Sequence, residues 1–379
     1  MSLLLRSSPM RILHIVNHIR RDGNGVTNVV VDLACLQAEA GNHVLLVAAR
    51  GEYQELLQAY GVTHVELEHT ALKKNPIKFL KAAIHYQRIL REFQPDIVHA
   101  HMIPGMVLAK LLRIGSKYKL VSTVHSEFQK GAWVMGLADR VIAVSQAVAQ
   151  AIVLRGFPSH KVTTVLNGTL GSPRMRSLDQ YSKANLQHPA ITTVAGMAER
   201  KGITELIEAF ERISKKFPDA HLYLVGDGPD RAKFEAEARK TSAFDRVHFE
   251  GFQLEPQKYL LATDIFVLAS HREPYGLVIS EAREVGCAIV ASRVDGIPEA
   301  LDNGQAGLLV APRNSEALAS ALEKLLSDSV SLRYWRGKAK QNLEGLKVAR
   351  VCGETLAVYH GLLGSADCGS ASEGSLKAL

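Results

Sequence analysis

The sequence has few cysteines and no long apolar run. Its four cysteines among 379 residues are scattered, without a Cys-x-x-Cys pair or a Cys/His cluster at zinc spacing, so neither a disulfide framework nor a structural zinc site is expected. No segment approaches the roughly 18 consecutive apolar residues of a membrane-spanning helix, and the apolar start at Leu3 to Leu5 is too short for a signal-peptide core. We therefore expect a cytoplasmic protein.

Two further features are missing. The sequence contains no Asp-x-Asp pair, the carboxylate pattern that often holds a divalent cation, so we expect metal-free chemistry and no cofactor. The basic residues are not interleaved with aromatic ones, and no nucleic-acid-binding signature is present. Nucleic acid is therefore not an expected partner.

Charge is distributed unevenly along the chain. Residues 1–185 hold 22 basic and 12 acidic residues, against 23 and 26 in the remainder, which gives net charges of +10 and −3. The first half is therefore expected to meet an anionic partner, either a membrane surface or a phosphorylated acceptor.

Part of this positive charge lies in residues 72–91, LKKNPIKFLKAAIHYQRILR, which read as a basic amphipathic helix. Such a helix can lie on an anionic membrane, or it can cover a sheet and expose its basic face to water. The sequence leaves both interpretations open.

Short apolar runs alternate twice with helical patterns. The expected strands cover residues 11–17, 43–49, 97–101, 119–124 and 140–144, and then 191–195, 221–225, 247–251, 265–268, 288–292 and 307–310. Apolar strands separated by helices indicate parallel sheets covered on both faces. The fold class is therefore α/β, with two Rossmann-like doubly wound domains facing across a cleft.

Composition sets the expected boundaries of these domains. Residues 1–170 form the first domain, the polar stretch 171–189 a linker and residues 190–345 the second domain. Residues 346–363 form a C-terminal helix that packs back on the first domain, and the Ser/Gly-rich residues 364–379 are expected to be disordered. Ligands of such folds bind at the carboxyl ends of the strands.

The segment 270–286, SHREPYGLVISEAREVG, carries the most chemistry. Glu273 lies in the loop after a strand, and Glu281 lies about one turn into the helix that begins near Leu277. A carboxylate there needs partners, which sugar hydroxyls can supply. The amides of Gly276 and the first helical turn form a seat for a pyrophosphate. The alternative is an ordinary helix start with one stabilising and one exposed glutamate.

Arg200 and Lys201 precede Gly202 and a helix, where cations are unfavourable because the helix N-terminus is itself positive. A bound diphosphate would make the position of these cations favourable. The cations would in turn stabilise the diphosphate as a leaving group. A solvated surface pair is the alternative.

Several other candidates lie after expected strands. His101 and His125 end two of them, and a histidine can donate or accept a proton there, although a satisfied or solvated side chain is the simpler interpretation. Asp227 lies in the turn Gly226 to Pro229, and Gly25 lies in the first glycine loop; both positions suit either a tight turn or close approach of a ligand.

The spacing Glu-x7-Glu in a second α/β domain resembles the family 4 retaining glycosyltransferases. Further segments in family order are the early glycine loop with Gly25, DIVHAH (96–101), STVH (122–125), AVS (143–145), VLNG (165–168), RKG (200–202), VGDGP (225–229), FEG (249–251), DIFVLAS (264–270) and DGIPE (295–299). The resemblance covers nearly the whole chain.

The resemblance implies a role for each matching position. Glu273 contacts the transferred sugar, Glu281 the ribose and Lys201 the diphosphate, while His125 holds a sugar hydroxyl or assists the reaction. Phe252 flanks the base, and the backbone of Gly276, Leu277 and Val278 holds phosphate or sugar. One departure is Met197, which follows Gly196 where the family usually has Arg; Arg200 is the candidate to supply that charge.

The function that follows is a metal-independent, retaining hexosyltransferase using a nucleotide-sugar. A UDP-sugar is favoured over GDP-mannose, with a glycan or lipid-linked acceptor in cell-envelope polysaccharide or lipopolysaccharide biosynthesis, at the inner face of the plasma membrane. The second domain is expected to bind the nucleotide-sugar and the first domain the acceptor, with His101 as a candidate acceptor contact. A catalytically silent binding protein and a sugar-phosphate epimerase are the alternatives. The paired glutamates argue against the first, and nucleotide release that depends on acceptor would exclude the second.

Overall fold

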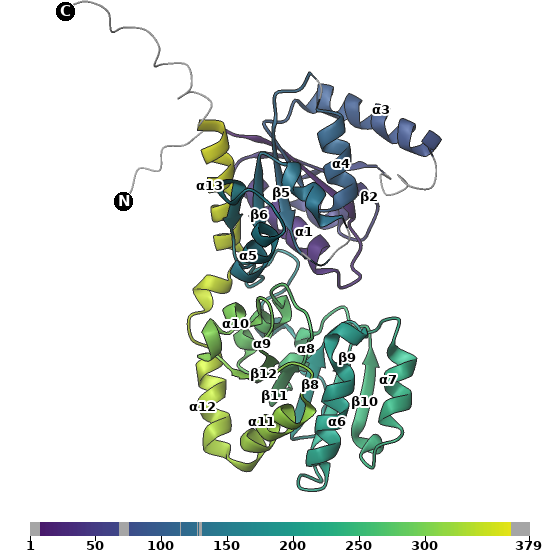
Figure 1. Ribbon diagram of the computed structural model, residues 1–379, viewed down its shortest axis with the longest axis vertical. Coiled ribbons are helices and arrows are strands. Elements are labelled where there is room, and N and C mark those ends of the chain that lie inside the picture. The colour runs from purple at the N-terminus through teal and green to yellow at the C-terminus, as the bar shows by residue number, and fades with distance from the viewer. Residues whose placement is uncertain (1–7, 68–75, 114, 127, 129–130, 365–379) are drawn as a thin grey trace, which may run out of the picture. The chain divides into compact units, whose positions relative to one another are not determined.

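The computed structural model describes residues 8–67, 76–113, 115–126, 128 and 131–364. The chain forms two compact units. The first contains residues 1–144, 148–166 and 349–379, and the second contains residues 145–147 and 167–348. Figure 1 shows that each unit is built around a sheet with helices packed against it. The predicted α/β class with two parallel sheets is confirmed.

The first unit contains a seven-stranded parallel sheet in the order β3-β2-β1-β4-β5-β6-β7. Its strands are β1 (Arg11–His18), β2 (His43–Ala49), β3 (Thr63–Glu66), β4 (Ile97–Ala100), β5 (Lys119–Val124), β6 (Arg140–Ala143) and β7 (Val162–Thr164). Its helices are α1 (Gly25–Glu39), α2 (Gln54–Ala59), α3 (Pro76–Phe93), α4 (Ile103–Leu111), α5 (Gln146–Leu154) and α13 (Val348–Gly364). The central strand β4 is buried along its whole length, because helices cover both of its faces.

The second unit contains a six-stranded sheet in the order β10-β9-β8-β11-β12-β13. Its strands are β8 (Ala190–Val194), β9 (His221–Val225), β10 (Val247–Gly251), β11 (Ile265–Leu268), β12 (Ala288–Ser292) and β13 (Leu308–Val310). Its helices are α6 (Ile203–Ser214), α7 (Arg231–Ala238), α8 (Gln257–Leu260), α9 (Leu277–Val285), α10 (Ile297–Ala300), α11 (Ser315–Ser327) and α12 (Ser329–Ala339). Helix α6 shows why these helices form, since Leu206, Phe210 and Ile213 recur at helical spacing and are all buried against the sheet.

Two features differ from the sequence-based expectation, whereas the placement of the C-terminal helix agrees with it. Residues 171–189 were predicted to be a linker, whereas they group with the second unit. The edge strands β3 and β7 were not predicted, because each is only three or four residues long and half-buried. Helix α13 groups with the first unit, where Arg350 Nη2 donates to the Leu166 carbonyl at 2.7 Å. The predicted disordered tail lies outside the described residues except for its first position, Gly364, which ends α13.

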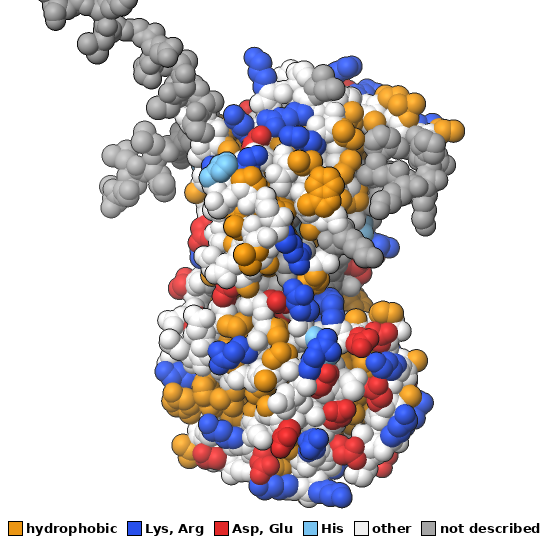
Figure 2. Space-filling view, in the orientation of Figure 1, with side chains coloured by type: hydrophobic (Ala, Val, Ile, Leu, Met, Phe, Trp, Pro, Cys, Tyr) orange, Lys and Arg blue, Asp and Glu red, His pale blue; other side chains and the backbone are white. Residues whose placement is uncertain are grey.

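Helix α3 has an unusual surface. It buries Ala83, Tyr86 and Leu90, but it also exposes a second apolar stripe of Ile77, Leu80 and Ile84, which are 67%, 60% and 63% accessible. Figure 2 shows hydrophobic side chains gathered over this helix. Residues 72–75 of the predicted basic stretch lie outside the described residues. Among the helices that the structure describes, none is long and apolar enough to cross a bilayer.

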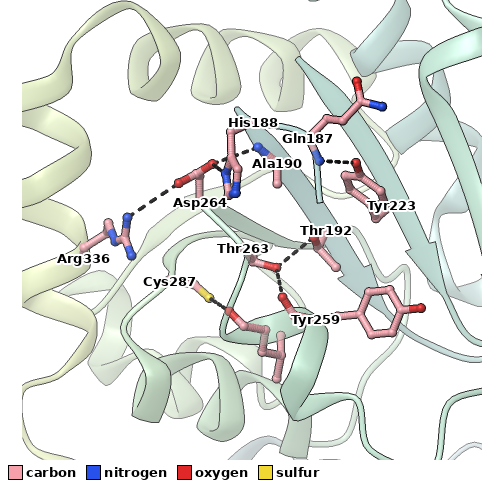
Figure 3. Close-up of polar contacts among 11 residues, drawn as sticks. Gln187, His188, Ala190, Thr192, Tyr223, Tyr259, Thr263, Asp264, Cys287 and Arg336 are labelled. Atoms are coloured by element: carbon pink, nitrogen blue, oxygen red, sulfur yellow. Dashed lines mark hydrogen bonds and ion pairs between the residues drawn. The ribbon is translucent and has the colours of Figure 1, made fainter. Parts of the chain in front are cut away.

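A polar cluster fixes the start of the second sheet (Figure 3). The Asp264 carboxylate accepts a hydrogen bond from the Ala190 amide at 2.9 Å and lies 2.6 Å from His188 Nδ1. Arg336 approaches the same carboxylate at 3.6 Å. These contacts pin the chain just before β8, at the amino ends of β8 and β11. The predicted functional residues of this unit follow the opposite, carboxyl ends of the strands.

Candidate active site

Two predicted site residues of the second unit meet in an ion pair. Lys201 follows β8 and Glu273 follows β11, which are neighbouring strands, and the Lys201 ammonium contacts the Glu273 carboxylate directly. Their side chains are only 13% and 12% exposed. Because so little water screens this pair, each charge depends strongly on the other. The sequence assigned these two residues to different parts of a ligand and did not predict that they pair.

Gly202 allows the Lys201 loop to approach the neighbouring strand. Its φ is +66°, and a Cβ built on it would lie 1.9 Å from the Ala269 carbonyl oxygen. Only glycine fits such a conformation and such a close backbone approach. Two contacts then join the loops: the His271 amide donates to the Arg200 carbonyl at 2.8 Å, and His271 Nε2 lies 2.7 Å from a Glu205 oxygen. The sequence reasoning missed Glu205 and His271.

Asp295, in the loop after β12, holds the Glu273 loop. Its carboxylate accepts hydrogen bonds from the Glu273 amide at 2.8 Å and from Arg272 Nε at 3.0 Å. The Gly296 amide in turn donates to the Glu273 carbonyl at 3.1 Å. The motif DGIPE at 295–299 served only as a marker of the family resemblance. An acidic residue followed by glycine at a strand end was the available signal of this role.

Helix α9 begins at the same end of the sheet. Its N-cap, Gly276, has a φ of +85°, and no side chain caps the helix. Leu277 and Val278 are half-buried in its first turn. Because the first amides of a helix have no intrahelical acceptors and carry partial positive charge, this end can receive an anion. Glu281 lies one turn on, with one oxygen 3.5 Å from Gln257 Nε2.

The other predicted donor residues are more exposed. Arg200 is exposed next to Lys201, and Phe252 is 45% exposed after β10. Asp227 is exposed in the turn after β9, where its carboxylate accepts from the Gly228 amide at 2.7 Å and lies 3.5 Å from Arg231. The structure therefore brings Lys201, Glu273 and Gly276 together and leaves these three at the surface.

Met197, the departure from the family pattern, lies in the second core, where its side chain is completely buried. The Met197 carbonyl accepts a hydrogen bond from the Asp230 amide at 3.0 Å, and the Met197 amide donates to the Asp227 carbonyl at 2.9 Å. The neighbouring Gly196 is exposed, and a Cβ built on it would lie 3.7 Å from its nearest neighbour.

The first unit contains a chain of histidines, of which His14, His99 and His101 are buried and His125 is half-buried. His14 on β1 and His101 after β4 approach to 3.0 Å between Nδ1 and Nε2, and His101 Nδ1 lies 3.2 Å from Nε2 of His125, which follows β5. His99 on β4 contacts Thr123 Oγ1 at 2.7 Å. The sequence singled out His101 and His125 but missed His14, although it is the one polar residue inside the apolar run Ile12 to Val16.

Burial keeps these rings neutral. It lowers the pKa of His14 to about 4 and that of His125 to about 3, and it holds the pKa values of His99 and His101 well below the ordinary value. His101 was predicted to touch an acceptor, but it is only 2% exposed and both ring nitrogens have partners within the protein. Its position supports His125 and does not fit direct contact with an acceptor.

Among the described residues, His14, His99 and His101 form the one group that could present metal ligands, with their nitrogens within 4.8 Å of one another. Hydrogen bonds already engage both nitrogens of each ring. A metal ion would have to displace several of these bonds. Gly25, also in this unit, is the first residue of α1, and the side chain of Asn24 accepts from the Val26 amide at that helix end.

Two family models match consecutive parts of the chain. The model described as "Glycosyltransferase Family 4" matches residues 23–169, and "Glycosyl transferases group 1" matches residues 176–342. The chain belongs to the family 4 glycosyltransferases. The resemblance inferred from the motifs is therefore confirmed.

Individual relatives are distant. A glycogen synthase of Mycobacterium tuberculosis is 28% identical over 277 residues, which cover 67% of this chain and 65% of that protein. The lipopolysaccharide core biosynthesis glycosyltransferase LpsE of Rhizobium meliloti is 26% identical over 337 residues, 86% of this chain and 91% of that one. The chain thus spans about two thirds of the glycogen synthase and most of LpsE.

Solved structures share the fold. The Anabaena protein HepE, in complex with UDP and glucose, superposes with a TM-score of 0.78 at 19% identity, covering 92% of this chain and 99% of that one. Both units of the present glycosyltransferase therefore have the architecture called GT-B.

Proposed function

We propose that this glycosyltransferase is a retaining hexosyltransferase that uses a nucleotide-sugar donor. The observation that carries the proposal is the Lys201–Glu273 ion pair beside the uncapped start of α9, with Glu281 one turn on. A cation and free helix amides can stabilise the charge that grows on a departing diphosphate. The two carboxylates can accept hydrogen bonds from hydroxyls of the sugar and the ribose.

The proposed roles follow the placement of each residue. Lys201 and Arg200 bind the diphosphate, Glu273 then turns from Lys201 toward the transferred sugar, and Glu281 binds the ribose. Phe252 and Asp227 lie after neighbouring strands and contribute to the nucleotide side. Gly25 and His125, in the first unit, are the other residues that we propose to bind the donor.

A UDP-sugar is the favoured donor and GDP-mannose the alternative. HepE has been solved with UDP-glucose, which supports a uridine nucleotide for a protein of the same fold. LpsE acts in lipopolysaccharide core biosynthesis by name, which supports a cell-envelope glycan or lipid acceptor. We also propose that the reaction needs no divalent metal, in line with the lack of an Asp-x-Asp pair.

The experiment is a screen of UDP-glucose, UDP-galactose and GDP-mannose by thermal shift, because a ligand of the folded state raises the melting temperature. Nucleotide release is then measured with and without truncated lipopolysaccharide as acceptor, in the presence of EDTA. Release without acceptor would indicate an epimerase or hydrolase, and loss of activity with EDTA would disprove metal independence. The anomeric configuration of the product, read by NMR, tests retention.

Two variants and one control test the site. Glu281→Ala is expected to weaken donor binding about tenfold, and Glu273→Ala to lower turnover more than binding. Glu208→Ala changes an exposed glutamate on α6 and serves as the matched control. Wild-type activity in both site variants would end the proposal.

We further propose that α3 rests on an anionic membrane. Its exposed stripe of Ile77, Leu80 and Ile84 lies on a helix that also exposes Lys81 and Arg91. Apolar and basic side chains on one helix are typical of interfacial helices, and the cytoplasmic leaflet carries the negative charge that attracts them. This surface supports a place at the inner face of the plasma membrane.

Flotation with phosphatidylglycerol and phosphatidylcholine vesicles tests the membrane proposal. The protein is expected to float with the anionic vesicles, and Ile84→Glu to abolish this. Leu154→Glu alters an 87% exposed leucine on α5 and should have no effect. Equal flotation of all three proteins, or none with anionic vesicles, would contradict it.

A further inference from the structure

The buried histidines end in a single amide group. The Gln37 side chain, on α1, is fully buried, and its Oε1 lies 2.7 Å from His14 Nε2. From His14 the contacts continue through His101 to His125 at 3.0 Å and 3.2 Å. Two imidazoles, those of His14 and His101, therefore connect the amide to His125, which the family resemblance places at the reaction.

This chain has a direction. A neutral imidazole has one N–H donor and one lone-pair acceptor, and an amide oxygen can only accept. His14 therefore donates from Nε2 to Gln37 and accepts at Nδ1 from Nε2–H of His101. His101 must then accept at Nδ1, so the proton on His125 lies on Nε2. The remaining nitrogen of His125, Nδ1, is left as a lone pair.

A second branch orients the amide. Gln37 Nε2 points toward the Tyr359 hydroxyl at 3.5 Å, and this hydroxyl lies 2.6 Å from His99 Nδ1. If the amide donates to Tyr359, the hydroxyl donates to His99 Nδ1, and His99 donates from Nε2 to Thr123 at 2.7 Å. Every hydrogen bond of both branches then has one donor and one acceptor. Tyr359 belongs to α13, so the C-terminal helix also takes part in setting this direction.

His125 lies beside a small cavity. The cavity holds about 20 Å³, room for one water-sized group, and is lined by residues that include Val26, Ile103, His125 and Ser126. In the described part of the chain, the Ser126 hydroxyl is buried without a partner, and His125 has no hydrogen bond besides that to His101. Polar groups with unused capacity point to a ligand at this place.

We propose that Gln37 is a positioning residue that fixes His125 in the Nε2–H form, so that Nδ1 accepts a hydrogen bond from a hydroxyl of the bound sugar. The proposed hydrogen bond with the sugar hydroxyl rests on the proposed function, whereas the proposed tautomer of His125 does not. A protonated Nδ1 could only donate to the hydroxyl oxygen, so the hydroxyl would have to turn its own hydrogen toward another acceptor. A glutamine remote from the reaction thereby selects the hydrogen-bonding role of His125.

NMR of the full chain, with ¹⁵N-labelled imidazoles and EDTA present, reads each tautomer directly from the nitrogen shifts. The His125 signals are assigned as those lost in His125→Asn. The wild type is expected to show protonated Nε2 and unprotonated Nδ1 on His125, His101 and His14. A His125 proton on Nδ1, or an even mixture, would overturn the proposal without any variant or activity assay.

Variants test the dependence on the amide. Gln37→Met removes the accepting oxygen at similar volume, and His125 is then expected to populate both tautomers. Gln58→Met changes an exposed glutamine on α2 and is the control. If Gln37→Met does not fold, Tyr359→Phe removes the group that orients the amide and is expected to give a mixture as well. An unchanged tautomer in a folded variant would refute the role of Gln37.

Calorimetry tests the proposed hydrogen bond between His125 and the sugar hydroxyl. Gln37→Met is expected to bind UDP-glucose about two- to tenfold more weakly, in proportion to the fraction of His125 in the wrong tautomer, and to bind UDP as the wild type does. If the tautomer changes but the affinity for UDP-glucose does not, the contact with the sugar hydroxyl is refuted and the role of Gln37 in fixing the tautomer stands. Failure of wild-type protein to bind any nucleotide-sugar would instead refute the proposed function and leave the tautomer result standing.

Discussion

The two units place functional side chains at the same ends of their parallel sheets, but with opposite electrostatics. In the second unit Lys201 and Glu273 are charged and pair with each other beside the positive start of α9. In the first, four imidazoles are kept neutral by burial and joined by hydrogen bonds. Charge is therefore the property that matters in the second unit, and the position of a proton on a ring is the property that matters in the first.

This contrast has a physical cause. A charge can remain in a poorly hydrated site only when a partner compensates it, and Lys201 and Glu273 provide that for each other. Among the residues that the structure describes, no acidic side chain contacts these histidines, so protonation would leave a buried charge uncompensated. A diphosphate can replace Glu273 as the partner of Lys201. No comparable exchange is needed in the first unit.

The largest expected effect comes from removing the charge of the second unit. Lys201→Met keeps the volume of the side chain but removes the cation, so turnover should fall about 100- to 1,000-fold. It also leaves Glu273 without its partner, which should lower the melting temperature. Steady-state kinetics and thermal melts check both. A control is Lys215→Met, a lysine just past the end of α6. A loss below threefold would contradict the proposed role of Lys201.

The next effect concerns the neutral histidines of the first unit. Because the folded pKa of His125 is lowered to about 3, the unfolded chain takes up its proton first as pH falls below about 6.5. The stability contributed by neutral His125 is therefore present above that pH and lost on acidification. Between pH 7 and pH 4.5 the stability difference between wild type and His125→Gln should fall by roughly 2–3 kcal/mol.

Urea unfolding at several pH values measures this difference. The comparison with His125→Gln removes the contribution of carboxylates, which titrate in both proteins. His360→Gln, which changes an exposed histidine on α13, is the matched control and should follow the wild type. A difference that stays constant with pH would show that His125 is not held neutral.

The smallest expected effect tests how the charged pair is positioned. Gly202→Ala would place a Cβ 1.9 Å from the Ala269 carbonyl oxygen at a φ of +66°, so the Lys201 loop would have to move. We expect a loss of about 1–3 kcal/mol in the free energy of unfolding, with reduced activity. Gly196→Ala is the control, since its Cβ would have only an ordinary contact at 3.7 Å. Equal stability of the two variants would contradict the argument.

Much of the fold followed from the sequence, because buried parallel strands are nearly continuous apolar runs. The strand predicted at 221–225 is β9, and the one at 288–292 is β12, with the same bounds. The edge strands β3 and β7 were not predicted, because short, half-buried strands lack a continuous apolar run. The placement of 171–189 was also missed, because polar composition does not reveal which unit a segment packs on.

In the candidate site, too, some residues could be predicted from the sequence and others could not. Local sequence was sufficient to mark Glu273, Lys201 and His125, since each directly follows an apolar strand and precedes a turn or helix. The partners that hold them, such as Asp295 for Glu273, come from other strands of the sheet. The burial of Met197 could not be predicted either, because local sequence does not show which side chains of a loop point into the core.

By itself, the sequence determined the alternation of strands and helices, the family and the residues at the strand ends, because these depend on local periodicity and short motifs. Only the tertiary structure decided that Lys201 pairs with Glu273, and that His14, His101 and His125 form one chain ending at Gln37. Those contacts join residues 23 to 87 positions apart, and only the order of strands in a folded sheet brings them within hydrogen-bonding distance.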